Sequence, residues 1–175
     1  MKALRFYDVQ DLRYEDAPDP VIEKPDGVIV KVKAVGICGS DIARYRNLGP
    51  YVPGNVWGHE FCGEVVEVGE GVKNLKPGDR VVGCPNMVCH ECEYCKSGHP
   101  SRCENLNTIG AYVPGAYAEY IKLPEINFVK MADSMSYEQG ALVEPATVAI
   151  HGLYQTSIKM GYEVAVVAVS YTHLR

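Results

Sequence analysis

The chain has 175 residues, of which 47% are hydrophobic and 22% charged, and its formal net charge is -5. This composition excludes a disordered or fibrous protein. The sequence has no cluster of Lys or Arg that could cover a phosphate backbone, no apolar stretch of membrane-spanning length, and no apolar block of a signal peptide at its start. We therefore expect a cytoplasmic protein that binds neither nucleic acid nor a membrane.

The first part of the chain, to about Lys130, consists of short β-rich runs separated by Gly and Pro, a pattern typical of barrel strands. The predicted strands are 28–34, 63–68, 80–83 and 116–123. A turn is predicted immediately before the third strand, at Lys76-Pro77-Gly78-Asp79, because Pro fixes φ and Gly supplies a backbone shape that other residues resist.

The sequence has seven cysteines, and the spacing of four of them is specific. Cys89, Cys92, Cys95 and Cys103 form a C-x2-C-x2-C-x7-C pattern in a polar stretch, here named the cysteine lobe (residues 84–104). Four thiolates at such spacing predict a closed structural zinc site, with His90 and His99 as bystanders. Unrelated buried thiols, a redox pair or an iron–sulfur cluster are the alternatives.

The pattern changes near Met135. Ser136 followed by Gln139 is a capping box, which predicts a helix that runs on to Met160, with Pro145 ending or kinking its first turns and Gly161 stopping it. The continuous apolar run 163–169 predicts a buried parallel strand of the kind that opens a Rossmann domain. Residues 170–175 contain no glycine, so we expect no dinucleotide loop, an atypical tail and no dehydrogenase activity of the chain by itself.

Four separate motifs resemble those of the zinc-dependent medium-chain alcohol and polyol dehydrogenases. They are Gly36-Ile37-Cys38-Gly39-Ser40-Asp41, Gly58-His59-Glu60-x-x-Gly63-x5-Gly69-x2-Val72, Lys76-Pro77-Gly78-Asp79-Arg80-Val81 and Leu142-Val143-Glu144-Pro145, in the same order and spacing. Together with the cysteine lobe, the resemblance covers essentially residues 1–169.

The resemblance implies a mainly β fold with some α structure. We expect a GroES-like, partly open β-barrel catalytic domain over 1–135 that carries the zinc lobe 84–104. The first helix and strand of a truncated Rossmann domain follow over 136–169, and the tail is 170–175. The implied cofactors are two Zn²⁺ per chain and NAD or NADP in the full-length protein, which we expect to be a homodimer or homotetramer.

The second zinc site follows from the resemblance and from metal chemistry. Cys38, His59 and Glu144 supply one thiolate, one imidazole and one carboxylate, and they leave an open position for substrate. Glu60 either replaces one of these ligands or holds a water on the metal. Ser40 is the hydroxyl that passes the proton of the alcohol outward. Taken singly, these residues also fit ordinary packing and surface roles.

The substrate class follows from Glu144, because the polyol branch of the family has glutamate at this position. The expected substrate is a polyol or polyol phosphate, with galactitol 1-phosphate as the first choice and the substrates of sorbitol, threonine and butanediol dehydrogenases as alternatives. Arg44 and Arg46 are candidate ligands for a substrate phosphate. The rivals are a catalytically silent zinc-binding module and the zinc-free quinone reductases of the same superfamily.

Overall fold

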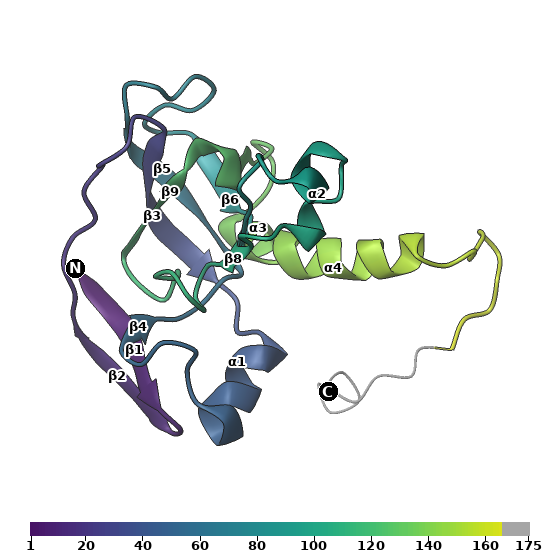
Figure 1. Ribbon diagram of the computed structural model, residues 1–175, viewed down its shortest axis with the longest axis horizontal. Helices are drawn as coiled ribbons and strands as arrows, with labels where there is room; N and C mark the ends of the chain where they lie inside the picture. The colour runs from purple at the N-terminus through teal and green to yellow at the C-terminus, as the bar shows by residue number, and fades with distance from the viewer. Residues whose placement is uncertain (166–175) are drawn as a thin grey trace.

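The computed structural model describes residues 1–165, and curled β-sheets form the body of this part (Figure 1). Figure 1 shows helix α4 (Val143–Tyr154) extending away from the sheets toward the C-terminal end. The mainly β fold expected from the sequence is confirmed. Within residues 1–165, no helix is long and apolar enough to cross a membrane.

The larger sheet has five antiparallel strands in the order β10-β6-β5-β3-β9. Their bounds are β3 (Gly27–Val35), β5 (Phe61–Val68), β6 (Arg80–Gly83), β9 (Tyr120–Pro124) and β10 (Phe128–Lys130). The strands predicted at 28–34, 63–68 and 80–83 are confirmed. The strand predicted at 116–123 is only partly correct, because residues 115–117 form their backbone hydrogen bonds with residues 56–58, outside this sheet.

The main core is a cluster of buried side chains that come mostly from the strands of this sheet. Val28 and Val30 of β3 and Val81 of β6 are fully buried. Phe61 packs edge-on against Phe128, with 6.3 Å between the ring centroids. Burial of such side chains is the main favourable term in folding, so this core fixes the strands whose ends carry the functional residues.

The smaller sheet has the strand order β2-β1-β4 and contains β1 (Lys2–Asp8), β2 (Asp11–Asp16) and β4 (Asn55–Val56). Between β3 and β4 the chain forms the short helix α1 (Gly39–Ala43) and the single π-helical turn η1 (Arg44–Leu48). This segment therefore connects the two sheets.

The turn predicted before β6 is confirmed. Gly78 has φ +91°, which favours glycine. The carboxylate of Asp79 accepts a hydrogen bond of 3.0 Å from the backbone N–H of Lys76 and lies 2.9 Å from Nζ of Lys130. Hydrogen bonds from Lys76 and Lys130 lower the pKa of Asp79 to about 2.

The capping box that opens the C-terminal helices is also confirmed. Ser136 and Gln139 exchange hydrogen bonds of 2.8 and 3.2 Å in front of α3 (Tyr137–Ala141). The expectation for Pro145 is confirmed, because the helix is interrupted at Leu142, and the ring of a proline at position 145 conflicts with the carbonyl group of Ala141, four residues earlier. The expected helix end at Met160 is wrong.

Helix α4 ends at Tyr154, because the hydroxyl of Thr156 forms local hydrogen bonds with Leu153 and Ile158 that compete with a further turn. At the predicted strand 163–169, residues 163–165 have no regular structure, and residues 166–169 lie outside the described residues, as does the tail 170–175. The proposed start of a Rossmann domain therefore stays a prediction.

The cysteine lobe is attached to the body of the domain by a neck of two short antiparallel strands, β7 (Asn86–Met87) and β8 (Asn107–Thr108). Between them lie α2 (Glu93–Lys96) and the 3-10 turn η2 (Pro100–Arg102). The lobe thus leaves and re-enters the body at adjacent points.

Candidate metal centres

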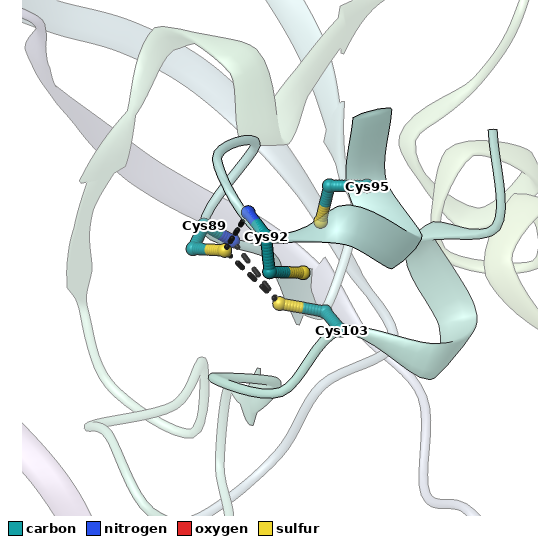
Figure 2. A group of neighbouring side chains, drawn as sticks. All are labelled: Cys89, Cys92, Cys95 and Cys103. Carbon is teal, nitrogen blue, oxygen red and sulfur yellow. Dashed lines mark hydrogen bonds between the residues drawn. The ribbon is translucent and has the colours of Figure 1, made fainter. Parts of the chain in front are cut away.

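The sulfur atoms of the four predicted ligands of the cysteine lobe converge (Figure 2). The Sγ atoms of Cys89, Cys92, Cys95 and Cys103 all lie within 4.8 Å of one another. The Sγ of Cys103 accepts a hydrogen bond of 3.3 Å from the N–H of Cys89, and the Sγ of Cys89 accepts one of 3.3 Å from the N–H of Cys92. Four sulfur donors around one point fit a tetrahedral zinc site.

The lobe is electrostatically suited to bind a cation. Hydrogen bonds from the backbone N–H groups of Glu91 and Cys92 lower the pKa of Cys89 to about 6. Burial and the neighbouring thiols raise the pKa of Cys95 to about 12. In the folded lobe Cys89 is therefore a thiolate near neutral pH, which reduces the competition of protons with a metal ion.

The other cysteines and the histidines of the lobe differ from this set. Cys62 is buried in β5, and its thiol donates to the carbonyl oxygen of Tyr137 at 2.8 Å, so it is a packing residue. Cys84, His90 and His99 are exposed.

The second cluster is built by the antiparallel pairing of β3 and β5. Val35 at the end of β3 faces Phe61 at the start of β5. Cys38 follows β3 and His59 precedes β5, so both emerge at the same end of the strand pair. The N–H of Gly36 donates to the carbonyl oxygen of Glu60 at 2.7 Å and extends this pairing toward the cluster.

Ligand atoms of Cys38, His59 and Glu60 lie within 4.8 Å of one another. The set contains one sulfur, one imidazole nitrogen and one carboxylate oxygen, a combination that zinc accepts. Glu144 is not among these three. It is half-buried, and burial raises its pKa. The charges of His59 and Glu60 also act on this pKa, so Glu144 lies near both residues.

The close contact between Glu60 and Gly36 explains why a glycine occupies position 36. Glu60 is buried, with 7% of its surface exposed. A Cβ atom at position 36 would lie 2.3 Å from Oε2 of Glu60. Any larger residue there has to displace the carboxylate that completes the cluster.

A buried carboxylate lies behind the candidate ligands. Asp41, which is 6% exposed, accepts hydrogen bonds from the indole N–H of Trp57 and, at 3.0 Å, from the backbone N–H of Cys38. Its Oδ1 lies 3.7 Å from Nδ1 of His59. Asp41 thus connects the loop that carries Cys38 with the segment that carries His59.

The remaining predicted site residues lie on α1 and η1. Ser40 is exposed in the first turn of α1. The guanidinium of Arg44 lies over the ring of Tyr51, 3.3 Å from its centroid, and donates to the carbonyl oxygen of Gly49 at 3.0 Å. Arg46 lines a cavity of about 470 Å³ together with Ile37 and Asp41. Arg44 is thus bound to neighbouring residues, whereas Arg46 borders a cavity. Their role as ligands of a substrate phosphate stays a prediction.

Sequence reasoning missed two residues of this region, Trp57 and Tyr117, both of which donate to Asp41. Trp57 lies close to His59 in the sequence, and this closeness could have placed Trp57 near the candidate site. Tyr117 and Asp41 are 76 residues apart, and no local pattern connects them.

With this geometry in view, comparison with known proteins gives a consistent result. Residues 24–133 match the family model of the alcohol dehydrogenase GroES-like domain. The sorbitol dehydrogenase of Bacillus subtilis (strain 168) is 38% identical over 174 residues, which are 97% of this chain and 49% of that protein. The chain thus spans about half the length of the curated relatives it matches.

Two solved structures are similar as well. The galactitol-1-phosphate dehydrogenase of Escherichia coli superposes with a TM-score of 0.85 at 35% identity, over 88% of this chain and 44% of that chain. A protein of Sinorhizobium meliloti 1021, assigned to the zinc-binding dehydrogenases and solved with NADP, has a TM-score of 0.81 at 37% identity, over 91% of this chain and 46% of that chain.

Proposed function

The chain belongs to the alcohol dehydrogenase GroES-like family, in which its relatives are zinc-type alcohol and polyol dehydrogenases, and we propose that it is the zinc-carrying part of such an enzyme. The reaction is oxidation of a secondary alcohol of a polyol or polyol phosphate to a ketone, with hydride transfer to NAD or NADP. The convergence of Cys38, His59 and Glu60 is the observation that carries this proposal.

We propose two zinc ions per chain, since two separate donor sets fit the metal. The four thiols of the cysteine lobe form a closed set with a structural role. Cys38 and His59, with Glu60 or Glu144 as the carboxylate, form an open set. A zinc ion in the open set acts as a Lewis acid and makes an alcohol easier to deprotonate.

The residues around the open set have separate roles in this proposal. Ser40, with its exposed hydroxyl, passes the proton of the alcohol toward solvent. Asp41 accepts hydrogen bonds around the cluster and keeps the imidazole of His59 oriented. Ligand atoms of Glu60 belong to the open set and Glu144 lies near it, so either carboxylate would hold the metal.

For the substrate we propose galactitol 1-phosphate, with sorbitol, threonine or butanediol as alternatives. The similarity to the Escherichia coli enzyme supports this choice. Arg46 borders the cavity that reaches Asp41, and it is a better candidate for the phosphate than Arg44, whose guanidinium is already held by Tyr51 and Gly49.

Metal analysis tests the function directly. The purified chain should contain two zinc ions, and His59→Ala should retain only the one in the cysteine lobe, because the lobe does not depend on His59. One zinc ion in the unaltered chain would favour a catalytically silent zinc-binding module.

Substrate class can be tested on the same material. With Co²⁺ in place of zinc, galactitol 1-phosphate should change the absorption of the open site at lower concentration than sorbitol does. Arg46→Ala should remove this preference, whereas equal responses in the unaltered chain would exclude a phosphate contact.

A further inference from the structure

A third segment, residues 116–117, is hydrogen-bonded to the two segments that carry ligands of the open site, the Cys38 loop and the residues before His59. The backbone N–H of Tyr117 donates to the carbonyl oxygen of Trp57 at 2.8 Å, and that of Ala116 donates to the carbonyl oxygen of Gly58 at 2.9 Å. These bonds tie residues 116–117 to the residues immediately before His59.

The side chain of Tyr117 extends this connection to the other ligand segment. Its hydroxyl lies 2.7 Å from Oδ2 of Asp41 and 3.1 Å from the carbonyl oxygen of Gly36. Gly36 and Asp41 flank Cys38 on its two sides. The phenol therefore reaches from the segment bound to Trp57 and Gly58 to the loop that contains Cys38.

The ring of Tyr117 packs against Gly58. Gly58 has φ +93°, and a Cβ atom there would lie 2.5 Å from a carbon of the ring. Burial, the hydrogen bond to Asp41 and the negative charges of Asp41 and Glu60 raise the pKa of Tyr117. The hydroxyl therefore keeps its proton at neutral pH and acts as a donor.

We propose that Tyr117 is a positioning residue, which fixes the Cys38 loop and the His59 segment relative to each other so that both side chains reach one metal ion. This inference rests on the proposed function. The essential element is the hydroxyl, because the hydroxyl alone contacts both sides of Cys38, whereas the ring contacts only the His59 side. Without it, Asp41 keeps the indole of Trp57 and the N–H of Cys38 as donors but loses the bond from the third segment.

Tyr117→Phe tests the proposal, because it keeps the ring and removes the hydroxyl. Tyr120→Phe is the matched control, since Tyr120 lies in the adjoining β9 strand, where its ring is 6.0 Å from Nζ of Lys31. The metal-free 175-residue chain is titrated with Co²⁺, and the thiolate-to-cobalt absorption is recorded. The spectrum of His59→Ala identifies the signal of the cysteine lobe, which serves as an internal reference.

Tyr117→Phe should weaken Co²⁺ binding at the Cys38 site by about tenfold, the lower end of the range for disturbing the hydrogen bonds around metal ligands. It should also change the absorption bands of that site, while the lobe keeps its affinity. Tyr120→Phe should match the unaltered chain. Unchanged affinity and bands in Tyr117→Phe would overturn the proposal, as would equal weakening of both sites, which indicates general destabilisation. If the unaltered chain binds only one Co²⁺, in the lobe, the proposed function itself fails and the positioning role fails with it.

Discussion

In the cysteine lobe all four candidate ligands come from one short stretch of chain, whereas the open site takes Cys38 and His59 from segments that only the pairing of β3 with β5 brings together. The lobe contains two short helical turns and buries just one of its four ligand residues, Cys103. The open site is supported by a buried carboxylate, a tryptophan and a tyrosine.

This difference indicates where the order of each site originates. A stretch too polar to build its own core depends on the metal for its structure. The open site lies at the edge of the main core, and its side chains are held by hydrogen bonds that do not need the metal. Removal of metal should therefore unfold the lobe but leave the open site arranged.

The largest expected effect is that of Cys92→Ser. It removes one ligand of the closed set, whose metal binding contributes about 10 to 16 kcal/mol in zinc-finger peptides at neutral pH. Backbone amides between β7 and β8 should lose their protection from hydrogen exchange, and the zinc content should fall by one, while β3 and β5 stay protected. Cys84→Ser, at an exposed cysteine outside the ligand set, should change neither quantity. Persistent protection of the lobe in Cys92→Ser would contradict its dependence on metal.

A smaller and purely local effect is expected from Gly36→Ala. The new Cβ atom would lie 2.3 Å from Oε2 of Glu60, so the carboxylate has to move out of the cluster. Co²⁺ affinity at the open site should fall by about tenfold, as for other disturbances close to a metal ligand. Gly39→Ala is the control, because a Cβ atom at position 39 meets nothing within 4 Å. Equal affinities of the two variants would show that Glu60 has no part in metal binding.

The smallest effect concerns the thiols of the zinc-stripped chain. In the folded lobe, backbone hydrogen bonds lower the pKa of Cys89 to about 6. Removal of zinc should unfold the lobe and break these hydrogen bonds, so at pH 7 iodoacetamide should modify Cys89 and Cys84 of the stripped chain at similar rates. Peptide mass spectrometry after timed quenching measures both rates in one sample. Modification of Cys89 about five- to tenfold faster than Cys84 would mean that the empty lobe keeps the backbone hydrogen bonds that prepare it for metal.

The parts of the molecule that the sequence predicted are those governed by local rules. The spacing of Cys89, Cys92, Cys95 and Cys103 places them on one loop, and the turn at Gly78 and the cap at Ser136 depend on neighbouring residues alone. The convergence of Cys38 with His59 was expected only through resemblance to a family, since spacing cannot reveal strand pairing.

The errors arose where contacts distant in sequence decide the outcome. Residues 116–118 have the composition of a strand, but they bind residues 56–58 and the N-terminal segment, and pairing with β3 begins only at Glu119. The helix end at Tyr154 depends on a hydrogen bond of the Thr156 side chain, and a hydrophobic pattern contains no information on such a bond. Tyr117 remained unnoticed for the same reason, because its partners are 76 and 81 residues away.

The neck formed by β7 and β8 has a consequence for how this domain can evolve. Asn86 pairs with Thr108 and Met87 with Asn107, and the Cα atoms of such antiparallel pairs are about 4.5 to 5.5 Å apart. A tight hairpin turn spans that gap, so the intervening stretch can be exchanged as a cassette without stretching the barrel. Lineages of this architecture are therefore free to shorten, lose or replace the insert, and a protein engineer can use the same junction to graft a foreign loop.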